Sequence, residues 1–154
     1  MEPLLNVFRY TEHIYYLNKT GRLAVGAEKE VTKAGNWTHT LMRNDIYIHY
    51  GCPEIWENEF EVKDGLISFF ADAVFMAGGQ AYFLEVDNQQ KMKENKDKLL
   101  RYKAFKDGGR WQKSHNGNFP FLLFYTSSEA RKAQIREMSP PGLDLKVLTS
   151  SDLY

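Results

Sequence analysis

The chain has 154 residues, 43% of them hydrophobic, so it is long and apolar enough for a globular fold with a core. Twenty Lys and Arg residues balance twenty Asp and Glu residues, and this zero net charge does not by itself indicate a nucleic-acid partner. A single cysteine, Cys52, excludes an intrachain disulfide and a cysteine-based zinc site, which favours a cytoplasmic location. No apolar run approaches the roughly 20 residues of a membrane span, so no membrane association is expected.

Apolar stretches alternate with glycine, proline and polar residues along the chain. In chain order they predict a hairpin at 14–26, a loop at 27–36, a helix at 37–50, strands at 54–62, 66–76 and 80–87, a helix at about 90–105, a loop at 106–118, a strand at 119–126, a helix from Ser127 or Ser128 to Met138 and a strand at 145–148. Thr38 is the expected cap of the first helix, where Ile46-Tyr47-Ile48 would also suit a strand. This order predicts an α/β fold with a mixed central sheet flanked by helices.

A Gly78-Gly79 pair between two apolar strands predicts a tight β-hairpin. In that register Asp72 lies directly opposite Glu85, and Asp87 projects from the same face as Glu85. Three crowded carboxylates repel one another, and a bound cation, Mg²⁺ or Mn²⁺, would offset the repulsion. The alternative is that Asp72 or Asp87 points to solvent and the clustering is accidental.

The helix that follows this hairpin carries Lys98 and Tyr102, which are four residues apart and therefore share a face. An acid, a hairpin turn and an acid-x-acid pair, followed by a lysine and a tyrosine on the next helix, outline a metal-dependent nuclease core. The candidate catalytic residues are accordingly Asp72, Glu85, Asp87, Lys98 and Tyr102, and the first three are the candidate metal ligands.

Charge is distributed unevenly along the chain. Residues 53–87 have a net charge of −7 and residues 88–113 a net charge of +6. Such asymmetry is typical of an acidic metal site beside a phosphate-binding surface, although a solvated helix with internal ion pairs has the same composition. The candidate contacts to the DNA backbone are the basic residues of the second segment, Lys91, Lys93, Arg101, Arg110 and Lys113.

Several of these segments resemble the replication-relaxation family of plasmids and other mobile elements. The matching segments, in order, are Ala71-Asp72-Ala73, Phe83-Leu84-Glu85-Val86-Asp87, Lys98-Leu99-Leu100-Arg101-Tyr102, and the apolar strand 119–126 with Arg131 in the helix after it. No single motif is specific, but their order and spacing together are. The resemblance covers about residues 14–138.

The resemblance implies a divergent restriction-endonuclease-like core, of the PD-(D/E)xK type. It makes Asp72 the first metal-binding acid and Glu85 the second. Asp87 stands where such nucleases usually have a lysine, and this departure puts catalysis in doubt. Lys98 could replace that lysine by reaching back from the helix, with Tyr102 supporting it.

Family members usually begin with a winged-helix DNA-binding domain, and the hairpin at 14–26 resembles its wing. Only thirteen residues precede that hairpin, so the chain resembles a truncated protein or a C-terminal fragment. We therefore expect an N-terminal hairpin in residues 1–30, either a wing remnant or an edge hairpin of a single domain. The nuclease-like α/β domain would occupy residues 31–154.

Three functions are compatible with this interpretation. The first is a DNA-associated protein of plasmid or mobile-element replication or transfer that cleaves or nicks DNA with Mg²⁺. The second is a non-catalytic DNA-binding or dimerisation module in replication control, whose partners would be a second copy of the chain or plasmid replication or transfer proteins. The third and weakest is a protein-interaction domain built on exposed aromatic residues such as Trp37, Trp56 and Trp111.

Overall fold

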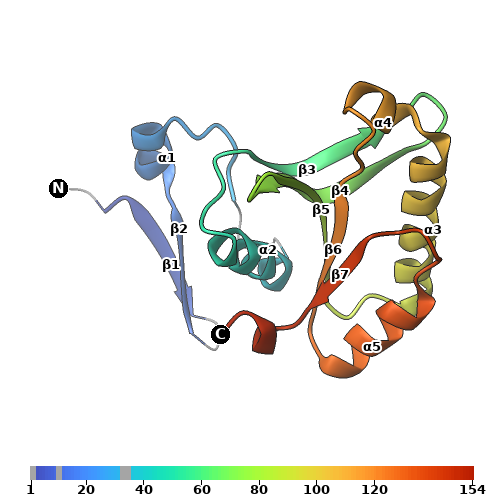
Figure 1. Ribbon diagram of the computed structural model, residues 1–154. Coiled ribbons are helices and arrows are strands. Elements are labelled where there is room, and N and C mark those ends of the chain that lie inside the picture. The colour runs from blue at the N-terminus through green and yellow to red at the C-terminus, as the bar shows by residue number, and fades with distance from the viewer. Residues whose placement is uncertain (1–2, 10–11, 32–35) are drawn as a thin grey trace. The chain divides into compact units, whose positions relative to one another are not determined.

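The computed structural model describes residues 3–9, 12–31 and 36–154, which form two compact units, Met1–Trp37 and Thr38–Tyr154 (Figure 1). The N-terminal unit contains the strands β1 (Leu5–Arg9) and β2 (His13–Leu17), which pair antiparallel, and the short helix α1 (Lys19–Val25).

The predicted hairpin at 14–26 is therefore wrong, because its second half is helix α1 and the observed hairpin pairs β1 with β2. Asn18 does not start a turn but caps the helix. Its side chain accepts a hydrogen bond from the Gly21 amide at 2.9 Å. Gly26 ends the helix in the left-handed conformation, with φ 68°. Asn and Gly serve equally in turns and in helix caps, so the residue types alone do not separate the two.

The second unit is an α/β layer structure. Its elements are α2 (Trp37–His49, whose first residue belongs to the N-terminal unit), β3 (Trp56–Lys63), β4 (Ser68–Ala77), β5 (Gln80–Asp87), α3 (Met92–Gly108), α4 (Arg110–Ser114), β6 (Phe121–Thr126), α5 (Glu129–Met138), β7 (Leu145–Leu148) and a 3₁₀ turn (Ser150–Asp152). The strands form one sheet in the order β3-β4-β5-β6-β7, antiparallel from β3 to β5 and parallel from β5 to β7. The predicted mixed sheet flanked by helices is confirmed.

Helices cover both faces of this sheet (Figure 1). On one face α3 and α5 bury Leu99, Phe105 and Ile135 against the strands. On the other face α2 contributes Ile46, which packs in a cluster with Phe75. Residues 46–48 are thus helical, and Thr38 lies inside α2 rather than at its cap. None of the described helices is both long and apolar enough to cross a membrane.

The Gly78-Gly79 turn is confirmed in the predicted register. Phe75 pairs with Tyr82 across it, and both glycines have positive φ values, 56° and 79°. A two-residue turn of this kind requires positive φ at both central positions, which glycine adopts without strain.

The predicted loop at 106–118 is wrong in its first part. Helix α3 continues to Gly108 and α4 occupies residues 110–114. Gly109, with φ 69°, separates the two helices. Adjacent glycines indicate a loop by composition, but here only the second of the two leaves the helical conformation.

Gly21 should be essential for the packing of the N-terminal unit. A Cβ atom at this position would lie 2.2 Å from the carbonyl oxygen of Leu4, so the backbone would have to move apart. We expect Gly21→Ala to destabilise this unit by about 1–3 kcal/mol, in the range of other overpacking substitutions. Amide hydrogen exchange should accelerate in residues 5–9 and 13–25 and stay unchanged in β5 and β6. Thr20→Ala, at an exposed neighbour, is the control, and equal exchange in both variants would contradict the expectation.

Candidate functional site

Glu85 is the centre of a polar cluster inside the second unit. Strand β5 places its side chain with only 1% of the surface exposed. Lys98 Nζ donates to Oε2 at 2.6 Å, and the Tyr102 hydroxyl donates to Oε1 at 2.6 Å. Both donors come from the inner face of α3, one helical turn apart. The expected lysine and tyrosine therefore do reach the strand carboxylate.

Asp72 joins this cluster from the neighbouring strand β4. The pairing between β4 and β5 ends with Ala73 opposite Leu84, one position before Asp72 would face Glu85. There the Asp72 carboxylate replaces the backbone as acceptor, and its Oδ2 accepts the Val86 amide hydrogen at 2.7 Å. Its other oxygen lies 3.2 Å from His39 Nε2, which comes from α2. Asp72 thus links β4 to β5 and to α2 at the point where the β4–β5 backbone hydrogen bonds end.

The two carboxylates have opposite electrostatic behaviour. Burial, supported by the Asp72 charge, outweighs the effect of Lys98 and raises the pKa of Glu85 to about 7. Burial also acts on Asp72, but hydrogen bonds from His39 and the Val86 amide outweigh it and leave the pKa of Asp72 below its usual value. Burial would lower the pKa of Lys98, yet the Glu85 carboxylate raises it overall, so Lys98 stays cationic.

Asp87 is close to the cluster but has its own cation. Its side chain is fully buried, and Arg131 of α5 binds both oxygens, with Nε at 2.7 Å and a terminal nitrogen at 2.8 Å. Thr126 donates to the same carboxylate at 2.6 Å. Burial is offset by these hydrogen bonds, Arg131 first, and the pKa of Asp87 lies below its usual value. A bidentate arginine pair of this kind fixes the carboxylate in one orientation.

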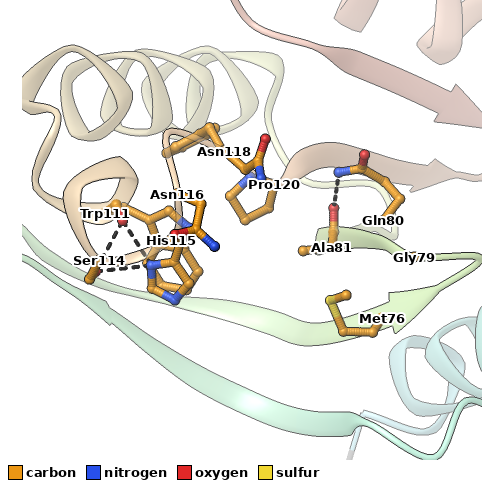
Figure 2. Close-up of a pocket in the computed structure, with 11 residues that line it drawn as sticks. Met76, Gly79, Gln80, Ala81, Trp111, Ser114, His115, Asn116, Asn118 and Pro120 are labelled. Carbon is orange, nitrogen blue, oxygen red and sulfur yellow. Dashed lines mark hydrogen bonds between the residues drawn. The ribbon is translucent and has the colours of Figure 1, made fainter.

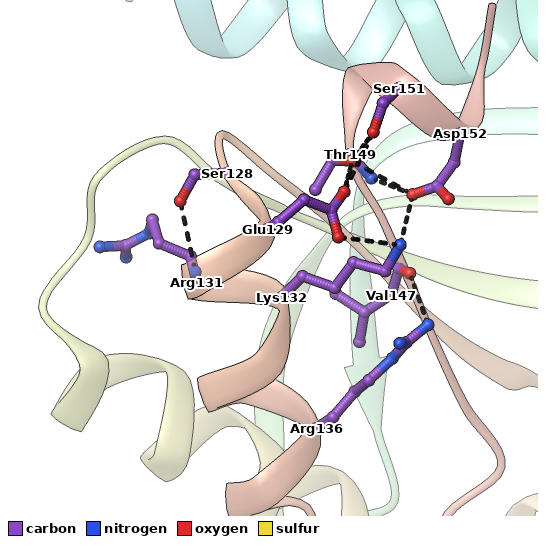
Figure 3. Close-up of polar contacts among 9 residues, drawn as sticks. All are labelled: Ser128, Glu129, Arg131, Lys132, Arg136, Val147, Thr149, Ser151 and Asp152. Carbon is purple, nitrogen blue, oxygen red and sulfur yellow. Dashed lines mark hydrogen bonds and ion pairs between the residues drawn. The ribbon is translucent and has the colours of Figure 1, made fainter.

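The end of α5 that carries Arg131 is itself fastened to the 3₁₀ turn that follows β7 (Figure 3). The Ser128 hydroxyl caps the helix by accepting the Arg131 amide hydrogen at 3.3 Å. Lys132 Nζ lies 2.7 Å from Asp152, which also accepts the Thr149 amide hydrogen at 2.7 Å. This network holds the first turn of α5 in place, so Arg131 meets Asp87 from a rigid helix.

All five expected DNA contacts are exposed on α3, at its start, or on α4: Lys91, Lys93, Arg101, Arg110 and Lys113. Arg110 also donates from its guanidinium to the carbonyl oxygen of Asp64 and thereby supports the β3–β4 turn. The structure gives Arg110 this structural contact besides any role at the surface.

The donor atoms of the cluster suit a divalent cation only in part. Within residues 3–9, 12–31 and 36–154, no group of three or more His, Cys, Asp or Glu side chains is placed to hold a metal. Mg²⁺, however, is usually bound by one or two carboxylates with water and substrate phosphate completing the shell. Asp72 and Glu85 are two electrostatically coupled carboxylates and fit that pattern. Asp87, with both oxygens bound by Arg131, does not belong to this donor set.

His39 is the main residue of the cluster that sequence patterns do not indicate. Its contact with Asp72 joins positions 33 residues apart, and no spacing rule links them. Arg131 belongs to a family motif, but nothing in that motif predicts its pairing with Asp87. The one available signal is that a buried acid at the end of a strand needs a cation, which could have come from any helix.

The fold and the cluster define an α/β protein with two coupled carboxylates, a lysine and a tyrosine at one end of a mixed sheet. The family model described as replication-relaxation matches residues 6–122. The chain therefore belongs to the replication-relaxation family, and the resemblance seen in the sequence is confirmed. This membership suggests a role in plasmid or mobile-element replication. None of the curated proteins compared with the chain matches it.

Glu85→Gln should change how stability depends on pH. A folded-state pKa of about 7, above the usual 4.5, means that the folded protein retains a proton that the unfolded chain has lost. Wild-type stability should therefore fall as the pH rises from about 4.5 to about 7, by an amount on the order of 3 kcal/mol. The variant lacks this effect and should gain relative to wild type at about pH 8 compared with about pH 5. Urea unfolding of both proteins between about pH 5 and about pH 8 measures this difference in the free energy of unfolding. If the free energies of the two proteins ran parallel with pH, the raised pKa of Glu85 would be contradicted.

Proposed function

We propose that this chain is a DNA-associated protein of plasmid or mobile-element replication or transfer. We further propose that its second unit is a nuclease-like domain that cleaves or nicks DNA with Mg²⁺ or Mn²⁺. The observation that carries the proposal is the convergence of Lys98 and Tyr102 on buried Glu85, beside Asp72. Buried groups with shifted pKa values and a charged partner are characteristic of catalytic centres. The mixed sheet between helices is compatible with a restriction-endonuclease-like core.

In this proposal Asp72 and Glu85 hold the cation, which would supply an activated water and stabilise the leaving oxygen. His39 orients the Asp72 carboxylate through its Nε2 contact. Tyr102 orients the Glu85 carboxylate in the same way from α3. With a pKa of about 7, Glu85 can accept or release a proton near neutral pH.

In this proposal Lys98 supplies the positive charge beside the phosphate. Nucleases of the PD-(D/E)xK type usually take that charge from a lysine at the position that Asp87 occupies here. Its ammonium-bearing side chain is 22% exposed and contacts a single carboxylate oxygen, so it can reach a phosphate without breaking a rigid pair. A positive charge placed there stabilises the negative charge that develops on the phosphate. The exposed residues Lys91, Lys93, Arg101 and Lys113 would hold the DNA backbone without reading its sequence.

A second candidate, a non-catalytic DNA-binding or dimerisation module, is favoured by one observation. Each oxygen of Asp72, Glu85 and Asp87 already has a hydrogen-bonding or ionic partner within the chain. The polar atoms of such a cluster are satisfied within the chain, so it does not need a cation to be stable. The nuclease-like fold would then serve to dock DNA.

Substitution of the cluster separates the two candidates. Under the catalytic proposal, Asp72→Asn and Glu85→Gln should each reduce DNA cleavage more than about 100-fold and remove the rise in melting temperature caused by Mn²⁺. Lys98→Met should reduce cleavage by a similar factor yet keep the Mn²⁺-dependent rise, because lysine is not a metal ligand. Lys96→Met, an exposed change on the same helix, is the control.

The catalytic proposal fails if wild type cleaves neither single- nor double-stranded DNA in Mn²⁺ and does not melt higher with the cation. In that case wild type and the acid variants should each melt at the same temperature with and without Mn²⁺, because the partners of the cluster lie within the chain and it holds no metal. That outcome supports the binding module.

Replacing Lys91, Lys93 and Arg101 by Gln should weaken DNA binding and flatten its dependence on salt. Each phosphate contact contributes about 0.9 to the slope of log affinity against log salt, so the slope should fall by about 3. The control replaces Lys103 and Lys106, which lie on the same helix but pair with Asp107 and Asp144. A salt titration followed by fluorescence anisotropy measures the DNA affinity and its salt dependence for both variants. An unchanged slope in the triple variant would show that Lys91, Lys93 and Arg101 face solvent and do not contact DNA.

A further inference from the structure

A second concave site lies at the opposite end of β5 from Glu85 (Figure 2). This pocket has a volume of about 390 Å³ and opens between the β4–β5 turn, helix α4 and the segment that leads into β6. Gln80 lines it and stands five positions before Glu85 on the strand, about 17 Å away at the usual rise per residue. The pocket is therefore separate from the carboxylate cluster, and its ligand chemistry is independent of those acids.

The described residues that line the pocket include no Asp, Glu, Lys or Arg. Its polar groups are instead the amides of Gln80, Asn116 and Asn118, with the hydroxyl of Ser114. The Gln80 amide nitrogen donates to the Ala81 carbonyl at 2.9 Å, which orients its oxygen as an acceptor. Amide side chains combine a donor and an acceptor on one plane, so they suit a neutral ligand whose edge carries both. A free phosphate, a metal ion or a carboxylate would find no opposite charge here.

One wall of the pocket is a stack of two aromatic rings. The His115 and Trp111 rings are 4.0 Å apart at the centroids and inclined by only 3°. His115 Nδ1 lies 2.8 Å from the Trp111 carbonyl and 3.0 Å from the Ser114 hydroxyl, which fixes the ring orientation. Trp111 is anchored in turn against Phe83 in the core. The outer His115 ring is exposed, so a flat ligand can extend the stack.

We propose that this pocket binds an unpaired nucleobase. A base is planar, uncharged and edged with hydrogen-bond donors and acceptors, and it stacks on aromatic side chains with little regard to sequence. The exposed Lys113 on α4 lies beside the lining residues in the chain and could contact the phosphate attached to such a base. The ligand chemistry is the same whether the base belongs to single-stranded DNA or to a free nucleotide. No group of the carboxylate cluster takes part, so base binding here is separate from catalysis there.

Three variants separate the two proposed interactions, which are stacking on the His115 ring and hydrogen bonding to an amide side chain. His115→Ala removes the exposed ring, whereas His115→Phe retains a ring that can stack. Asn116→Gly removes one amide without backbone strain, because residue 116 has φ 54°, which glycine adopts readily. His49→Ala, at another exposed histidine of the same unit, is the matched control.

The probes are a labelled short deoxyadenylate oligonucleotide, the same sequence in a blunt duplex, and deoxyadenosine monophosphate. Measurements in EDTA and at elevated salt suppress cleavage and contacts to the backbone. We expect the single strand to bind more tightly than the duplex, and His115→Ala to weaken single-strand binding roughly five-fold or more. His115→Phe and His49→Ala should stay within about two-fold of wild type, and Asn116→Gly should weaken binding less than His115→Ala.

Nuclear magnetic resonance with the monophosphate distinguishes the two sources of the base. If the monophosphate causes saturable chemical-shift changes at residues 79–81 and 111–120, and the oligonucleotide binds no more tightly than the monophosphate, the ligand is a free nucleotide. Tighter binding of the oligonucleotide would identify single-stranded DNA. Equal affinity of wild type and His115→Ala for both probes, or no shifts at these residues, would overturn the proposal. Asp72→Asn and Glu85→Gln should bind the base as wild type does, so failure of catalysis leaves this result intact.

Discussion

Providing polar partners for three acids at one end of β4 and β5 is the constraint that ties the helices to the sheet. Three different helices supply the partners: α2 brings His39 to Asp72, α3 brings Lys98 and Tyr102 to Glu85, and α5 brings Arg131 to Asp87. A buried carboxylate without a partner would be strongly destabilising. The same contacts therefore fasten helices on both faces of the sheet at this end, in addition to the apolar packing that holds each helix on the strands.

Local rules are sufficient for the part of the site that a hairpin and one helix define. The Gly78-Gly79 turn sets the register, so the sequence alone places Asp72 near Glu85. The four-residue spacing places Lys98 and Tyr102 on the face that meets Glu85. In both cases the partners are joined by short segments whose geometry allows few alternatives.

The remaining contacts lie beyond such rules because they join distant segments. His39 and Asp72 meet only because α2 packs across the sheet, and Asp87 finds Arg131 from 44 residues away. The alternation of a strand correctly places Asp87 near Glu85, yet it does not show that an arginine binds it. At the N-terminus Asn18 suits a turn and a helix cap equally, and in the structure it caps the helix in which Gly21 packs closely against Leu4.

Arg131 and Lys98, which bind two of the acids, differ in how easily each can leave its carboxylate. Arg131 binds both oxygens of Asp87 through Nε and one terminal nitrogen, and the same terminal nitrogen also donates to the Gln90 carbonyl. Lys98 is a compact charge that makes one short contact with Glu85 and is partly exposed. An ammonium can exchange one oxygen partner for another by a small rotation, whereas a bidentate guanidinium would have to break two aligned hydrogen bonds. The aspartate at position 87 thus holds Arg131 in a structural pair, and in the catalytic proposal Lys98 is the cation that responds to an incoming phosphate. A raised pKa of Glu85 works in the same direction, because protonation of that carboxylate weakens its hold on Lys98 near neutral pH.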